Sequence, residues 1–86
     1  MTLKELISSI SKDIEILKSY TEKSFFGVDI DYVEFKIGNH YYLVSELEYC
    51  VLTEQTPDRS KDISGPKTFS RRGLKEYIKR LLILEN

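Results

Sequence analysis

Apolar residues in the first part of the chain recur every three or four positions, the spacing of one face of an α-helix. The residues Thr2 to Glu5 match a capping box, in which the Thr2 hydroxyl and the Glu5 carboxylate each accept a backbone N–H of the other residue. The pattern predicts an amphipathic helix over about residues 2–22. The apolar positions are Leu3, Leu6, Ile7, Ile10, Ile14 and Leu17.

Part of this stripe also fits a heptad seam, so the helix has two possible neighbours: a sheet, or the same helix of a second copy. Two heptads are too few to define a coiled coil. Packing on a sheet is therefore the favoured interpretation.

A β-hairpin is predicted in the middle of the chain, with strands over about residues 31–37 and 40–45. Gly38-Asn39 separates the two β-prone runs, and a glycine at the first position of a two-residue loop favours a type II′ turn. That turn pairs Ile37 with His40 and divides the hairpin into two faces. The apolar face carries Val33, Phe35, Ile37, His40, Tyr42 and Val44, and the mixed face carries Tyr32, Glu34, Lys36, Tyr41, Leu43 and Ser45.

Residues 46–54 allow two interpretations. The run from Tyr49 to Thr53 has the composition of a strand, whereas Ser45-Glu46-Leu47-Glu48 matches a second capping box and would start a helix. A strand over about residues 49–54 is favoured, because a two-stranded hairpin alone is marginal in water.

The rest of the chain is predicted to be a loop followed by a helix. Residues 55–69 contain both prolines and Gly65 without a clear period, and they are expected to form a long surface connection. Ser70 is a good N-cap, and Phe69 and Leu74 are spaced as a hydrophobic staple. These signals predict a second amphipathic helix over about residues 70–84.

The fold class that follows is α+β: a single domain over residues 1–86, with a three-stranded antiparallel meander between N- and C-terminal amphipathic helices. Two packings remain open. Either the second helix covers the mixed face, or both helices cover the apolar face and leave an aromatic patch exposed, a composition enriched in protein interfaces.

The composition favours an ordinary globular protein, since 41% of the 86 residues are hydrophobic and 31% are charged. The apolar runs are too short to span a bilayer, and the chain does not start like a signal peptide. A cytoplasmic protein without a membrane partner is therefore expected. A domain of this length buries only about 60% of its unfolded surface, so a protein partner or a homo-oligomer would add buried area.

Catalytic and metal chemistry is not predicted. Cys50 is the only cysteine, which excludes an internal disulfide and a zinc cage, and it is expected to be a buried, inert thiol. His40 is the only histidine, and its position favours a partly exposed turn residue over a general base. We expect no catalytic residue, no metal and no cofactor, and hence no enzyme.

Charge is distributed unevenly along the chain. Residues 1–65 carry 7 Lys and Arg against 12 Asp and Glu, whereas residues 66–86 carry 6 against 2. Two candidate surfaces follow. The candidate for a protein partner consists of Tyr32, Glu34, Tyr41, Leu43, Glu46, Glu48 and Glu54. The candidate for nucleic acid or an acidic partner consists of Lys67, Arg71, Arg72, Lys75 and Lys79.

The small size, the mixed charge and the missing catalytic machinery resemble, in general style, small phage or mobile-element proteins that inhibit host machinery, including anti-CRISPR inhibitors. This resemblance implies a non-enzymatic protein-binding module that acts as an inhibitor or accessory factor. The alternatives are a homodimeric accessory protein, joined through the exposed sheet face or the heptad seam, and a nucleic-acid-binding protein that uses the last helix.

Overall fold

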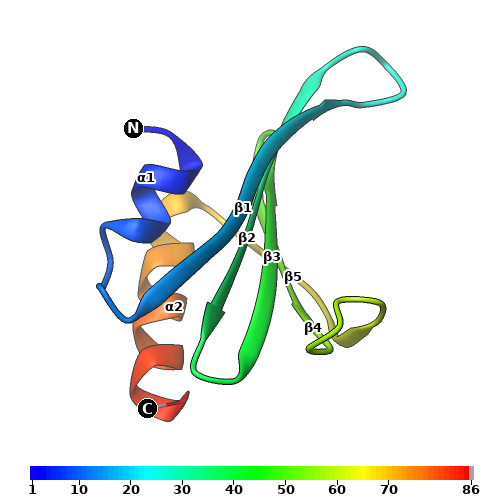
Figure 1. Cartoon of the computed structure of the whole chain (residues 1–86). Helices are drawn as coiled ribbons and strands as arrows, with labels where there is room; N and C mark the ends of the chain where they lie inside the picture. Colours follow the sequence, from blue (N-terminus) through cyan, green and yellow to red (C-terminus); the bar gives the residue numbers. More distant parts are fainter. Residues whose placement is uncertain (86) are drawn as a thin grey trace.

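The computed structural model describes residues 1–85. It contains two helices and five strands, and Figure 1 shows the long β1–β2 hairpin extending beyond the helices. The elements are α1 (Leu3–Ser8), β1 (Ile14–Lys23), β2 (Asp29–Ile37), β3 (His40–Glu46), β4 (Cys50–Gln55), β5 (Asp62–Phe69) and α2 (Arg71–Glu85).

The strands form one antiparallel sheet in the order β1-β2-β3-β4-β5, so each strand pairs with its neighbours in sequence. The α+β class is confirmed. The predicted three-stranded meander is wrong in detail, because a further strand is added at each side of it.

The predicted helix over residues 2–22 is wrong beyond its first turns. Helix α1 begins with the capping box, in which Glu5 N donates to Thr2 Oγ1 at 3.1 Å, but it ends at Ser8. The serines that follow bond to nearby backbone: Ser9 Oγ donates to a main-chain carbonyl at 2.8 Å, and Asp13 N donates to Ser11 Oγ at 3.1 Å. Such local bonds compete with helical ones, and they end the helix here.

The residues after these serines form strand β1 instead. Ile14 lies opposite Ile37 of β2 and Ile16 lies opposite Phe35, so both isoleucines lie on the face of the sheet that carries the core. A register shift at Leu17 then marks a β-bulge. The apolar residues of this stretch allow helical spacing as well as strand alternation, and burial against β2 decides in favour of the strand.

The predicted loop over residues 55–69 is also wrong, because Asp62–Phe69 form β5. The strand pairs with β4 alone, and its residues up to Thr68 are exposed. Proline is tolerated on an edge strand, where Pro66 lies. A strand that is exposed on both faces has no alternation of apolar and polar residues, so the sequence pattern does not reveal it.

The predicted hairpin is confirmed with its register. Ile37 pairs with His40, and the pairing continues through Phe35 and Tyr42. Gly38 has φ of 58° and Asn39 does not have a positive φ, which is the arrangement of a type II′ turn.

The strand interpretation of residues 49–54 is confirmed by β4, and the helix predicted over residues 70–84 is confirmed by α2. The N-cap of α2 is Ser70, whose Oγ accepts from Gly73 N at 3.1 Å.

Both helices lie on one face of the sheet, as Figure 1 shows. A single core cluster joins the buried side chains of α1 and α2 to the apolar face predicted for the hairpin. Its buried members are Leu3, Ile7, Ile14, Val33, Phe35, Ile37, Tyr42, Val44, Cys50, Leu52, Leu74, Ile78 and Leu81. The molecule therefore has two layers, and the second sheet face carries no helix.

Within residues 1–85, neither helix is long and apolar enough to cross a membrane.

Candidate functional site: the open face of the sheet

The sheet face opposite the helices is the candidate site, and we call it the open face. The register places Tyr20 opposite Tyr32, Glu34 opposite Leu43, and Lys36 opposite Tyr41, and residues two apart on a strand share a face. The open face therefore brings together side chains from β1, β2 and β3. Its central residues are half-buried: Tyr20, Tyr32, Glu34, Lys36, Tyr41 and Leu43.

The tyrosines of the open face are ordered by ring contacts. The rings of Tyr20 and Tyr32 stack with centroids 5.0 Å apart and an angle of 12° between their planes. Lys18 Nζ lies 4.7 Å from the Tyr20 centroid, and Lys36 Nζ lies 5.8 Å from the Tyr41 centroid. Partial burial, followed by the charges of Glu34 and Glu22, raises the pKa of Tyr20. The neutral phenol is therefore favoured, and the face presents flat apolar rings with hydroxyl groups, the composition of many protein interfaces.

Glu34 lies between these rings and pairs with a residue from the distant β4–β5 loop. Arg59 Nη1 lies 3.4 Å from Glu34 Oε1, and the Glu34 side chain is only 15% exposed. Since β3 lies between β2 and β4, the loop has to approach Glu34 across the open side of the sheet. Residues 56–61 therefore border the open face, and in Figure 1 this loop lies on the side away from the helices.

The β4–β5 loop is held in shape by Asp58. Its carboxylate accepts from Thr56 Oγ1 at 2.6 Å, from Ser60 Oγ at 2.8 Å and from Ser60 N at 3.1 Å. These bonds, with the Thr56 hydroxyl first, lower the pKa of Asp58 to about 2. The next residue, Arg59, adopts a left-handed backbone with φ of 62°, a conformation that is uncommon outside glycine. An ordered turn thus presents Arg59 to the open face.

The acidic part of the predicted partner surface is not brought together with the tyrosines. Tyr32, Glu34, Tyr41 and Leu43 share the open face as predicted. In contrast, Glu46 and Glu54 lie on the strand positions of the helix-covered face, and Glu48 lies in the β3–β4 turn. Glu54 was correctly predicted to lie in a strand, whereas Glu46 was predicted to follow the second hairpin strand and instead ends β3. Both glutamates occupy strand positions that alternate to the helix-covered face.

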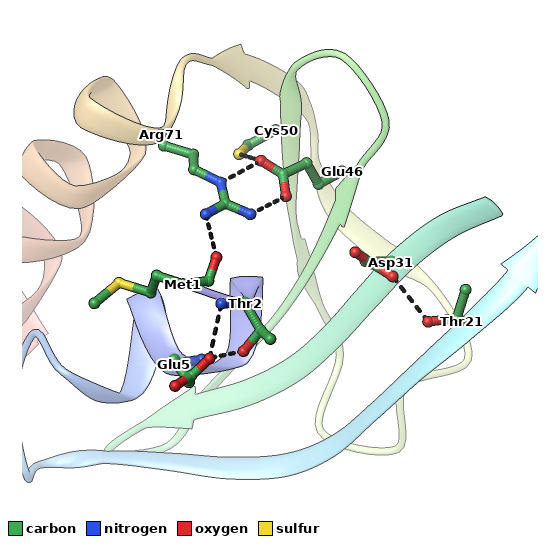
Figure 2. Close-up of polar contacts among 8 residues, drawn as sticks. All are labelled: Met1, Thr2, Glu5, Thr21, Asp31, Glu46, Cys50 and Arg71. Atoms are coloured by element: carbon green, nitrogen blue, oxygen red, sulfur yellow. Dashed lines mark hydrogen bonds and ion pairs between the residues drawn. The ribbon is translucent and has the colours of Figure 1, made fainter. Parts of the chain in front are cut away.

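Glu46 belongs to a network that joins both ends of the fold (Figure 2). Arg71 Nε and Nη2 donate to its two carboxylate oxygens at 2.7 and 2.6 Å, and Arg71 Nη1 donates to the Met1 carbonyl at 2.6 Å. Cys50 Sγ also donates to Glu46 Oε2 at 3.5 Å. The Arg71 hydrogen bonds lower the pKa of Glu46. This network connects β3, β4 and α2 with the residue at the start of the chain, so Glu46 and Arg71 contribute to the structure of the fold.

The residues of the predicted basic surface also do not form one group, because some of them bond to other side chains of the fold. Arg71 bonds to Glu46, and Lys67 Nζ donates to Tyr77 Oη at 2.7 Å while lying 4.9 Å from the Tyr77 ring. Lys79 Nζ lies 3.7 Å from the Glu76 carboxylate on the same helix. Of the five predicted residues, Lys67 and Arg71 bond to side chains of other elements or of the following helix, and Arg72, Lys75 and Lys79 remain as a group on the outside of α2.

The sole histidine and the sole cysteine lie at opposite ends of the sheet. His40 begins β3, and Cys50 pairs with Glu46 at its other end. At 3.3 Å per residue this separation is about 20 Å. His40 Nδ1 lies 3.1 Å from Glu54 Oε2. Cys50 is fully buried, which confirms the predicted burial of its thiol. Burial is also the main reason that the pKa of this thiol is raised to about 11. The two residues do not form a nucleophile–base pair. In the described part of the chain, no group of three His, Cys, Asp or Glu side chains is arranged to hold a metal ion.

Sequence reasoning missed two residues of the site and one exposed pair of residues outside the open face. Tyr20 was assigned to a helix, because its neighbours Lys18, Ser19, Thr21 and Glu22 are all polar and show no apolar–polar alternation of a strand. Arg59 pairs with Glu34, which is distant in the sequence, and no local sequence pattern predicts this contact. Phe25 and Phe26, at the tip of the β1–β2 hairpin, are 97% and 86% exposed and contact each other edge to face with centroids 5.4 Å apart.

The fold and the open face together define a two-layer α+β domain with one helix-covered and one open sheet face. Compared with protein-family models, with curated proteins and with solved structures, the chain matches nothing in any of the three.

Proposed function

We propose that the protein is a non-enzymatic, cytoplasmic protein-binding module whose binding surface is the open face. The single observation that carries this proposal is the placement of both helices on the opposite face. A small sheet normally covers its apolar and aromatic residues with a second layer. Here Tyr20, Tyr32, Tyr41 and Leu43 have no helix above them, so a partner can supply that layer.

The chemistry of the open face supports a protein as the partner. Tyrosine is enriched at interfaces because its ring buries a large area while its hydroxyl keeps a hydrogen bond. The Tyr20–Tyr32 stack restricts both rings before binding, which reduces the ordering cost of association. Lys36 and the Arg59–Glu34 pair surround the rings with charges of both signs, as in the polar rim of an interface. An inhibitory or accessory role for this module, like that of the small phage proteins it resembles in style, belongs to the same proposal.

The test compares partner capture by wild-type protein and by a Tyr32→Ala/Tyr41→Ala variant, each immobilised and exposed to lysate of the native host. The amount of each protein captured by the wild type should be at least tenfold lower on the variant. Interface tyrosines often contribute about 2 kcal/mol or more to binding, and about 1.4 kcal/mol already corresponds to a factor of ten in affinity. The retained protein is then purified and titrated against both forms to obtain the two dissociation constants.

The matched control is Tyr49→Ala, which removes an exposed tyrosine from the β3–β4 turn, outside the open face. It should keep the wild-type capture profile. Circular dichroism establishes that all three proteins are folded. If the double variant captures the same proteins in the same amounts as the wild type, the assignment of the open face is wrong.

A further inference from the structure

The two edges of the sheet differ in how far they are protected against pairing with another strand. In the part of the chain that the structure describes, β1 and β5 are the outer strands, each with one unpaired side. The β5 edge carries Gly65 and Pro66, and proline removes a backbone donor. The ten residues of β1 include neither glycine nor proline, and its bulge at Leu17 comes before the regular segment Lys18–Lys23. The outer edge of this regular segment is therefore the better template for a further strand.

The outer part of β1 has a chemical symmetry about Tyr20. After the bulge at Leu17, the strand runs Lys18-Ser19-Tyr20-Thr21-Glu22 in regular register with β2. The basic Lys18 lies two residues before Tyr20, and the acidic Glu22 lies two residues after it. The direct neighbours of Tyr20 are the hydroxyl residues Ser19 and Thr21. Lys18, Ser19, Thr21 and Glu22 are all exposed.

This symmetry makes the strand complementary to itself when it is paired antiparallel with Tyr20 at the centre. Lys18 then faces Glu22 of the second copy, Ser19 faces Thr21, and Tyr20 faces Tyr20. Opposite charges, hydroxyl pairs and aromatic pairs are the cross-strand combinations that stabilise a sheet, each by about 0.2–1 kcal/mol. A two-fold axis repeats the charge pair and the hydroxyl pair, so the same contacts count twice.

We propose that a second copy of this chain binds along the outer edge of β1, antiparallel about a two-fold axis at Tyr20, and continues the five-stranded sheet into the second molecule. The open faces of the two copies then join into one surface. The stacked Tyr20–Tyr32 pair of each copy meets its equivalent at the axis, which places four tyrosines in a row across the dimer.

The exposed hairpin tip supports the same arrangement. In an antiparallel pair, the end of one β1 lies beside the start of the other β1. Phe25 and Phe26 follow β1 after Ser24, so in this arrangement they lie toward the start of the second copy's strand, where Leu17 is half-buried. The dimer thus gives an apolar neighbour to two phenylalanines that are almost fully exposed in the single chain.

The experiment exchanges the charges of the edge and measures self-association by sedimentation equilibrium from low micromolar to near-millimolar concentration. The wild type should dimerise. Lys18→Glu places two glutamates opposite each other across the axis, and Glu22→Lys places two lysines there. Since each change acts twice in the dimer, each single variant should weaken dimerisation by about tenfold or more.

Mixing the two single variants provides the decisive measurement. A Lys18→Glu chain and a Glu22→Lys chain restore opposite charges at both pairs, so the mixture should form a heterodimer although each variant alone is weakened. The Lys18→Glu/Glu22→Lys double variant should likewise dimerise as the wild type does. Circular dichroism on each variant controls for folding, because Lys18 also faces Glu34 within the chain.

Three results would overturn the proposal: a wild type that stays monomeric at every concentration, single variants that dimerise as strongly as the wild type, or folded single variants that do not associate when mixed. An extended segment of another protein on the same edge would give the first of these results. The test is independent of partner capture by Tyr32 and Tyr41, so either proposal can fail without the other.

Discussion

At the scale of single residues, Arg71 connects more of the structure than any pattern in the sequence suggests. Its guanidinium bonds to Glu46 through two hydrogen bonds and to the Met1 carbonyl through a third. The arginine lies in the first turn of α2, where a positive charge opposes the helix dipole. The bidentate pair with a carboxylate that is only 13% exposed explains why this residue type stands there.

The Glu46–Arg71 pair predicts a pH dependence of stability. The pKa of Glu46 is lowered from its ordinary value of 4.5 by the Arg71 hydrogen bonds, so the folded state favours the ionised carboxylate. This contribution is complete above the ordinary pKa, and it is lost as the pH falls through the lower pKa of the folded state. The free energy of unfolding of Glu46→Gln should therefore lie below that of the wild type at neutral pH, and the gap should close in acid. Urea unfolding at a series of pH values measures it.

Glu48→Gln is the control for this effect, because Glu48 lies exposed in the β3–β4 turn. Its unfolding free energy should follow the wild type over the whole pH series. A gap between Glu46→Gln and the wild type that stays constant into strong acid would contradict the ionic origin of the effect.

At the scale of elements, the central hairpin and the last helix could be predicted from the sequence because their signals are local. Gly38-Asn39 defines the turn and its register, and Ser70 defines the start of α2. Tyr32, Glu34, Tyr41 and Leu43 were placed on one face by strand alternation alone. These predictions needed no knowledge of distant contacts.

The two edge strands could not be predicted because their signals are ambiguous or missing. The apolar residues from Leu3 to Leu17 fit a helix as well as they fit a short helix followed by a strand, and only pairing with β2 separates the two. Strand β5 is exposed on both faces, so it has no alternation. Tyr20 was missed with its strand, and the Arg59–Glu34 contact depends on how the β4–β5 loop approaches the sheet.

The β2–β3 turn provides a test at this scale. Gly38 has φ of 58°, where a Cβ atom is strained, so Gly38→Ala should lower the free energy of unfolding by about 1–2 kcal/mol. Gly65→Ala is the matched control in β5, because a Cβ added there meets nothing within 4 Å and no positive φ is required. It should leave stability unchanged or raise it by up to about 1 kcal/mol. Equal losses in both variants, measured by urea unfolding, would contradict the turn assignment.

At the scale of the whole molecule, apolar surface is divided between a dense core under the helices and an exposed tip at the far end of the hairpin. Phe35 is fully buried in the core, while Phe25 and Phe26 lie beyond the helix layer. The molecule measures 39 × 28 × 20 Å along its principal axes, and this projecting hairpin contributes to the elongated shape. Residues of the same type thus contribute to the core in one place and are exposed to solvent in the other.

This division predicts opposite effects for phenylalanine substitutions. Phe25→Ser/Phe26→Ser should change the free energy of unfolding at dilute protein by no more than about 0.5 kcal/mol, since both side chains are exposed. The variant should also leave a hydrophobic-interaction column earlier than the wild type. Phe35→Ala should cost about 3–5 kcal/mol through the cavity it creates. A double variant at the tip that unfolds as readily as Phe35→Ala would show that the tip is part of the core.

The meander order of the strands also sets the course by which the chain can fold. Each strand pairs with the next one along the chain, so every step of the sheet closes a short loop, which is fast and costs little entropy. The packing of α2 depends on the paired strands, because Leu74 and Ile78 belong to a core to which several strands contribute. The bond from Arg71 to the carbonyl of Met1 joins residues 70 positions apart, so it closes a much longer loop than the pairing of neighbouring strands does. We therefore expect this contact between the two ends of the chain to form later than the strand pairs.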